Sequence, residues 1–315
     1  MNTVIRNLKH RIEYLGVLWL AWIASRVSLK TLRKLGRSLG CWVFSVVRIR
    51  RQVTLDNLRQ AFPDKDEREI VKLARATYEH FGMTMLESLK LLSMSREEVT
   101  EAIQILDDRA LQQAKEAGRG AVMITGHMGN WEYLGAWVSI NGFPATFMFQ
   151  EQANPYVSRL IRTYRERMGM DVVPRGMALR SYLRALKQGR FVAAVADQDA
   201  GRNGIFVHFL GRPASTPTGP ARFALKTGAP IIFSISYRDQ SGHLFGQFET
   251  LNIEYDPGDE AVALRRIVEA YTRQLETWIR KYPEQWFWMH RRWKTQPERE
   301  NSVSQTREAL HSASW

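Results

Sequence analysis

Residues 121–140 have the sequence AVMITGHMGNWEYLGAWVSI: an apolar run, a turn and a helical pattern in immediate succession. The compact apolar run at 121–125 predicts a buried strand, and apolar residues at helical spacing predict a helix over 131–140. Asn130 is the predicted N-cap of that helix, because a short polar side chain at this position can accept a bond from the first turn. The segment 126–130 therefore lies where a strand ends, which is where open α/β sheets keep their functional groups.

The same alternation continues along the chain. Further strands are expected at 145–149, 171–173, 191–196, 230–237 and 244–253, and helices at 155–168, 177–188, 217–227 and 260–281. Strands that alternate with helices of this length predict crossover connections, and so an α/β fold with a largely parallel, mixed sheet flanked by helices. Upstream, a long helix is expected from Asp64 to about residue 92, with Asp64 and Glu67 as its capping box, and a shorter helix at 111–117.

Positive charge is concentrated at one end of the chain. The 315 residues include 45 Lys or Arg and 32 Asp or Glu, a net charge of +13, which indicates an anionic partner. Residues 1–60 contain twelve of the basic and two of the acidic residues, so this segment has a charge of +10 and the other 255 residues share +3. A nucleic-acid-binding enzyme would more often spread its basic residues over the folded domain. No nucleic-acid partner is therefore expected, and a membrane surface is favoured.

The basic segment also contains two uncharged stretches, at 14–25 and 38–47. Twelve helical residues extend about 18 Å, short of the ~30 Å hydrocarbon core. Flanking Lys and Arg with Trp19, Trp22 and Trp42 favour a helix that lies in an anionic membrane surface. A buried helical hairpin is the alternative, and a cleaved signal peptide is disfavoured because no small-residue cleavage site follows. We expect three parts: a membrane-associating helical segment at 1–60, an α/β domain at 61–295 and a disordered polar tail at 296–315.

Several reaction classes lack their motifs. The sequence has no GxxxxGK[ST], no GxGxxG after a strand and no HExxH, and its one cysteine, Cys41, excludes an intramolecular disulfide. Residues 36–40 match the nucleophile-elbow pattern GxSxG, but that elbow needs a strand before Ser38, and the preceding residues form a basic helical pattern. Ser38 is therefore not expected to be catalytic.

His127 and Glu132 are the candidate catalytic pair. His127 lies in the loop after the strand, and Glu132 lies in the first turn of the following helix. A carboxylate that holds an imidazole makes it an effective general base, because it fixes the tautomer and stabilises the imidazolium. The alternative is a structural histidine at a helix start, which an isolated H-x4-E pattern would favour.

The pattern is not isolated. GHMGNWE at 126–132 is followed by Asn154-Pro155, by Arg165-x-Arg167, by DQDAGR at 197–202, by PTGP at 217–220 and by PEQWFWMHRRWK at 283–294. These blocks, in this order, resemble the bacterial late lipid A acyltransferases, a lauroyl/myristoyl transferase family within the H-x4-D/E glycerolipid acyltransferase superfamily. The dense match covers about residues 120–295, and the basic apolar N-terminus is also similar to that of the family.

The resemblance implies transfer of a fatty acyl group from acyl-acyl carrier protein to a hydroxyl of an anionic lipid A precursor. It places the protein at the cytoplasmic face of the inner membrane and implies no cofactor or metal, because a thioester is already activated. A lysophospholipid or other lipid acceptor is the alternative; a non-catalytic basic protein that binds membranes or nucleic acid is a more distant one. The implied base is His127, oriented by Glu132.

Four further residues are candidates for substrate binding. Arg165 is implied to hold a lipid phosphate, although its surroundings would equally suit a solvated charge. Asp197 is expected in a hydrogen-bonded role, with Asp199 ordering the turn into Gly201; an Asp-x-Asp metal site lacks further clustered ligands. Backbone amides around Gly129 and Asn130 are candidates for stabilising an oxyanion. The aromatic block at 286–294 is expected to form an interfacial belt or a core strand.

Overall fold

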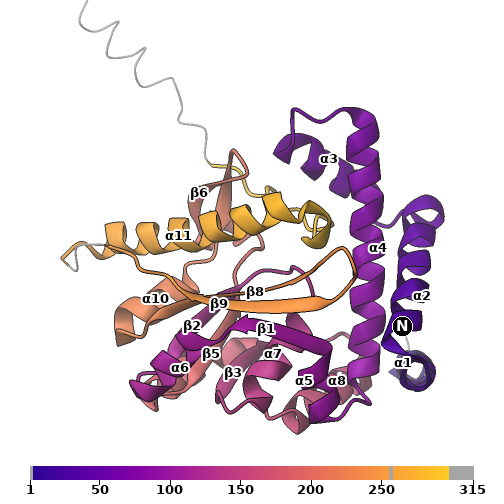
Figure 1. Ribbon diagram of the computed structural model, residues 1–315, viewed down its shortest axis with the longest axis horizontal. Helices are drawn as coiled ribbons and strands as arrows, with labels where there is room; N and C mark the ends of the chain where they lie inside the picture. Colours follow the sequence, from indigo (N-terminus) through magenta and orange to yellow (C-terminus); the bar gives the residue numbers. More distant parts are fainter. Residues whose placement is uncertain (1–2, 255–257, 298–315) are drawn as a thin grey trace, which may run out of the picture.

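The computed structural model describes residues 3–254 and 258–297, and its centre is a seven-stranded sheet (Figure 1). The strand order is β1-β9-β8-β2-β5-β3-β4. All neighbours are parallel except β8 and β9, which form an antiparallel pair. The strands are β1 (Ile103–Asp107), β2 (Ala121–Thr125), β3 (Ala145–Phe149), β4 (Asp171–Pro174), β5 (Phe191–Val195), β8 (Ile231–Arg238) and β9 (Leu244–Thr250). The predicted α/β fold with a largely parallel mixed sheet is confirmed.

Helices cover both faces of the sheet. One face packs against α9 (Ala178–Lys187), α10 (Gly219–Thr227) and α11 (Glu260–Lys281), together with the separate hairpin of β6 (Ile205–Phe209) and β7 (Arg212–Thr216). The other face packs against α5 (Arg96–Ala102), α6 (Arg109–Glu116), α7 (Trp131–Ile140) and α8 (Pro155–Arg167). Each face has its own apolar core, as a two-sided α/β sheet requires.

The long helix α4 (Glu67–Leu91) connects the sheet to the N-terminal helices (Figure 1). The helix was predicted, but the predicted position of its capping box, Asp64 and Glu67, is wrong by two residues. Asp66 accepts the bond from Glu69 N, and the Glu69 side chain accepts from Asp66 N. Residues 62–65 form a turn, closed by the bond from Lys65 N to Phe62 O, so the helix starts after it.

Three α-helices and one π-helical turn precede α4: α1 (Thr3–Arg26), α2 (Leu29–Trp42), η1 (Val43–Val47) and α3 (Arg51–Ala61). The described part of the chain contains no helix that is both long and apolar enough to cross a membrane. Of α1, only Ala21 and Ala24 are buried among the described side chains. Helix α1 is therefore largely exposed, which differs from the buried hairpin considered as an alternative, whereas α2 buries Leu32, Gly36 and Gly40.

Helix α2 packs against α4 through backbone contact. A Cβ atom on Gly40 would lie 2.0 Å from the carbonyl oxygen of Tyr78, and one on Gly36 would lie 2.7 Å from that of Gly82. Small residues four apart allow two helices to approach this closely. The GxSxG match at 36–40 thus lies within a helix, and Ser38 is exposed there, as the prediction against a catalytic elbow requires.

Most of the expected 61–295 domain lies in this α/β body. Three short elements, η2 (Arg175–Met177), η3 (Gly201–Asn203) and η4 (Pro283–Gln285), complete it. Of the expected disordered tail at 296–315, residues 298–315 lie outside the described residues.

Candidate active site

The register of two neighbouring strands brings His127 and Asp197 together. Strands β2 and β5 are parallel, with Thr125 opposite Val195, and His127 and Asp197 each lie two residues beyond these ends. The Nδ1 atom of His127 lies 2.7 Å from Oδ1 of Asp197. The backbone amide of His127 donates a second bond, 2.6 Å long, to Oδ2 of the same carboxylate. The sheet itself therefore positions this pair.

The two side chains differ in their access to solvent. The Asp197 side chain is 2% exposed and that of His127 is 23% exposed. Trp286 Nε1 donates a third bond, 2.8 Å long, to Oδ2 of Asp197. Because the carboxylate accepts at Nδ1, it favours the tautomer with a proton on Nδ1, which leaves Nε2 as the basic atom. The imidazole can therefore accept a proton from outside while Asp197 stays enclosed.

The pKa values of the pair move apart. Burial lowers the pKa of His127, but the charge of Asp197 and its hydrogen bond raise it more, with a further contribution from Glu132, so the pKa is above its ordinary value of 6.5. Burial raises the pKa of Asp197, but the charge of His127 and the bonds from His127 and Trp286 lower it to about 2. An ionised carboxylate beside an imidazole stabilises the imidazolium that forms when the base takes up a proton.

Glu132 has a different partner from the one the sequence pattern favours. Nε and Nη2 of Arg165 donate to its two carboxylate oxygens at 3.2 and 2.6 Å, a bidentate ion pair that is largely buried. The structure gives Glu132 no hydrogen bond to His127 among the described residues; the carboxylate bonded to the imidazole is Asp197. The reason is geometric: Glu132 extends from the first turn of α7 toward α8, whereas the imidazole faces the end of β5.

Aromatic rings enclose the imidazole. The ring of Trp131 meets that of His127 edge-on at 5.0 Å between centroids, and Phe287 lies at 6.1 Å. Phe287 N also donates to His127 O. The aromatic block is neither an interfacial belt nor a core strand: Trp286 and Trp288 are buried in the core, and one isolated bridge joins Trp286 to Met128.

The backbone around Gly129 and Asn130 is already engaged. Gly129 N donates to Gln285 O, and Asn130 N donates to Ser236 Oγ at 3.0 Å. Asn130 is fully buried and is the N-cap of α7, as predicted, through a bond from Tyr133 N to Oδ1. These two residues therefore hold the loop in place, and their amides do not face an open site.

Asp199 has the structural role expected for it. Its Oδ2 accepts from Gly201 N at 3.2 Å and from Thr295 Oγ1 at 2.9 Å. In the described part of the chain, no three His, Cys, Asp or Glu side chains gather as they would around a metal ion.

Sequence reasoning missed the hydrogen-bonding role of Trp286. No local pattern distinguishes a tryptophan that donates to a buried carboxylate from one that only fills the core. The one available signal was the position of Trp286 inside the block at 283–294, which carries part of the family resemblance.

The chain is similar to known acyltransferases. A model of the family described as bacterial lipid A biosynthesis acyltransferase matches residues 2–295. Among curated proteins, the chain is 25% identical to a lipid A biosynthesis lauroyltransferase of Escherichia coli, over 94% of this chain and 96% of that protein. It is 28% identical to a lipid A biosynthesis palmitoleoyltransferase of Escherichia coli, over 92% of each chain. It is also 26% identical to a phosphatidylinositol mannoside acyltransferase of Mycolicibacterium smegmatis, over 70% of this chain and 72% of that protein.

Proposed function

Because the chain belongs to the bacterial lipid A biosynthesis acyltransferase family, we propose that it transfers a fatty acyl group from acyl-acyl carrier protein to a hydroxyl of a lipid A precursor. The observation that supports this most is the partly exposed His127, bonded through Nδ1 to the buried Asp197. A sugar or acyl-chain hydroxyl has a pKa far above 7, so its attack on a thioester needs a base within hydrogen-bond reach.

In the proposed reaction, Nε2 of His127 takes the proton of the acceptor hydroxyl while the oxygen attacks the thioester carbonyl. The new C–O bond gives a tetrahedral intermediate. Its collapse breaks the C–S bond, and the imidazolium returns the proton to the departing thiolate. Asp197 holds the imidazole in the required tautomer throughout and stabilises its charged form.

Glu132 and Arg165 complete the proposed site. The charge of Glu132 also raises the pKa of His127, so this carboxylate supports the imidazolium without a hydrogen bond to it. Arg165 binds Glu132 through Nε and Nη2, which leaves Nη1 to meet a phosphate of the acceptor lipid.

The N-terminal segment supports a membrane location. Thirteen of the twenty large apolar side chains that are exposed in the described part of the chain lie between residues 5 and 49, among the basic residues of this segment. Each basic residue near anionic lipid contributes roughly 1 kcal/mol, so these helices can hold the protein on a bilayer surface without crossing it. We propose the cytoplasmic face of the inner membrane as that surface.

A second acceptor class is a phosphoglycolipid other than lipid A. The similarity to a phosphatidylinositol mannoside acyltransferase favours this class, because the name of that relative states a phosphoglycolipid acceptor that is not lipid A. Both acceptors share a phosphate and a sugar hydroxyl, which suits the same base and the same arginine.

The test is acyl transfer by the purified full-length protein, with acyl-acyl carrier protein as donor and products identified by mass spectrometry. We expect an O-acylated lipid A precursor, and a turnover at least 10²-fold lower for His127→Ala. Transfer to phosphatidylinositol mannoside or a lysophospholipid alone would replace the proposed acceptor. A folded His127→Ala protein with wild-type transfer would overturn the proposed base.

A further inference from the structure

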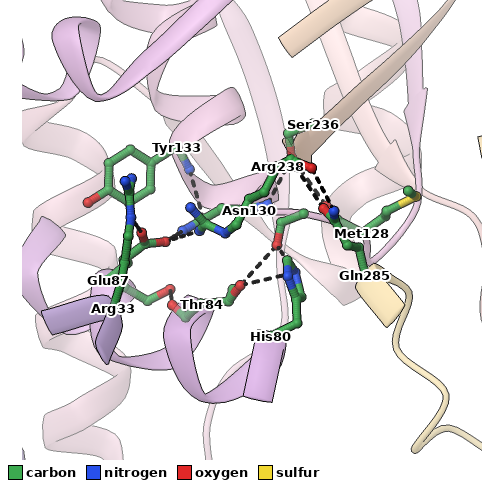
Figure 2. A network of polar contacts seen from close by, with 12 residues as sticks. Arg33, His80, Thr84, Glu87, Met128, Asn130, Tyr133, Ser236, Arg238 and Gln285 are labelled. Atoms are coloured by element: carbon green, nitrogen blue, oxygen red, sulfur yellow. Dashed lines mark hydrogen bonds and ion pairs between the residues drawn. The ribbon is translucent and has the colours of Figure 1, made fainter. Parts of the chain in front are cut away.

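The loop that follows His127 is held by buried side chains of α4 and β8 (Figure 2). The carbonyl oxygen of Gly129 accepts from His80 Nε2 at 3.1 Å and from Thr84 Oγ1 at 3.0 Å, both from α4. Ser236 of β8 accepts from Asn130 N and donates to the carbonyl of Met128. Every residue from 128 to 130 is therefore bonded to a neighbouring element.

Gly129 shows how closely these elements approach. Its φ is +61°, and a Cβ atom there would lie 2.2 Å from the carbonyl oxygen of Ser236. Only glycine fits both the backbone angle and the space. A larger residue at position 129 would therefore displace the loop or β8.

Glu87 is the charged centre of these surroundings. Its carboxylate, 1% exposed, accepts from Asn130 Nδ2 at 2.9 Å, from Arg33 Nε at 2.6 Å and from Arg238 Nη2. Burial raises the pKa of Glu87, but the charges of Arg238 and Arg33 lower it more, so the carboxylate is ionised. The backbone of Arg238 is fixed in turn by the side chain of Gln285.

Arg33 comes from a different part of the molecule. It lies on α2, within the basic N-terminal segment, but its side chain is only 19% exposed and points inward to Glu87 (Figure 2). Lys34 and Arg37 on the same helix are exposed. One of the basic residues of this segment is therefore bound to the body of the protein and is not available to lipid.

We propose that Glu87 is a positioning residue for the loop at 127–130, and that its ion pair with Arg33 makes the geometry of the loop depend on the placement of α2. The proposal rests on the proposed role of His127. The chain of contacts runs from α2 through Arg33 and Glu87 to Asn130, three residues after the base. Displacement of a catalytic group by about 1 Å can reduce a rate by 10²-fold, so a small shift of this loop has a measurable effect.

The decisive variant is Arg33→Gln in the full-length protein. Glu87→Gln would leave the buried Arg238 without its carboxylate and can unfold the domain. Arg33→Gln removes a partner at the edge of the cluster and leaves Glu87 paired with Arg238. Acyl transfer is measured with acceptor in non-ionic detergent micelles, and amide hydrogen exchange is followed by mass spectrometry in peptides that cover residues 126–134.

We expect Arg33→Gln to lower kcat by about tenfold to a hundredfold, to leave KM within about twofold and to speed exchange in 126–134 only. Arg33→Lys keeps the positive charge, so its kcat and its exchange rate in 126–134 should lie between those of Arg33→Gln and the wild type. The matched control is Arg280→Gln, which removes an exposed arginine paired with Glu276 on α11 and should match the wild type.

Wild-type exchange in residues 126–134 of Arg33→Gln would overturn the proposal, because the loop would then be held without α2. Faster exchange in this segment with wild-type kcat would support the contact chain and overturn the catalytic assignment of the loop. The two failures are therefore distinguishable. A fall in thermal stability with equally faster exchange in all parts of the domain would also overturn the proposal, since it would indicate that Arg33 has a general structural role.

Discussion

Replacing Asp197 with asparagine exchanges one oxygen for an NH2 group in a carboxylate that accepts three bonds. Two of the donors, His127 N and Trp286 Nε1, point to Oδ2, and the third, His127 Nδ1, points to Oδ1. If the amide oxygen occupies the Oδ2 position, both of its bonds survive, but the NH2 group faces Nδ1. The imidazole must then accept at Nδ1 and hold its proton on Nε2, which removes the base.

The opposite amide orientation keeps the active tautomer but places NH2 against two buried donors. An unsatisfied buried donor costs about 1–3 kcal/mol, so this orientation is about 2–6 kcal/mol less favourable. At 1.36 kcal/mol for each factor of ten, the active form is populated roughly 30-fold to 10⁴-fold less. We expect kcat of Asp197→Asn to fall by that factor.

The assay is single-turnover transfer of a radiolabelled acyl group, with saturating acceptor and with thermal melting measured in parallel. The control is Asp171→Asn, the same change at a half-exposed aspartate of β4, which should leave kcat unaltered. A folded Asp197→Asn protein with wild-type kcat would refute the role of Asp197. If Glu132→Gln alone were impaired, Glu132 would be the orienting carboxylate.

Three further results are expected. Because the pKa of His127 lies above 6.5 and the base must be neutral, kcat/KM should rise with pH through an apparent pKa above 6.5, and this rise should move to lower pH in Asp197→Asn. Arg165→Lys should lose nearly as much activity as Arg165→Ala, because an ammonium cannot reproduce the bidentate contact with Glu132 or bind a phosphate as a guanidinium does. Wild-type kinetics for the lysine variant would show that the positive charge alone suffices. Gly40→Ala places a methyl group 2.0 Å from a carbonyl of α4 and should cost about 1–3 kcal/mol of unfolding free energy in urea, whereas Gly16→Ala, with no atom within 4 Å, should be neutral or stabilising.

The segments with strong periodicity could be predicted from the sequence. The strand at 121–125 and the helices at 131–140 and 260–281 have the predicted bounds. Strand β7 was missed because RPAST contains a proline and little apolar alternation, and without a partner strand the apolar run of β6, IFVHF, was missed with it. Strand β1 was also missed. It is a half-exposed edge strand, and the residues of β1 alone do not indicate that it pairs with β9.

The site was only partly accessible to sequence reasoning. The position of His127 at a strand end follows from local pattern, but its hydrogen-bond partner lies 70 residues away in the sequence. Glu132 was favoured because it is near in sequence. The choice between Glu132 and Asp197 depends on the β2–β5 register, which pairs residues 125 and 195 and which no local pattern encodes.

The glycine contact between α2 and α4 has a consequence for how the molecule stands on a bilayer. At Gly36, Gly40 and Gly82 the backbones of α2 and α4 lie so close that a Cβ atom at any of the three would clash. If a lipid surface binds the outer side of α2, as we propose, this close packing transmits the orientation of α2 on that surface to α4 and the sheet, and so to the direction in which His127 faces the bilayer.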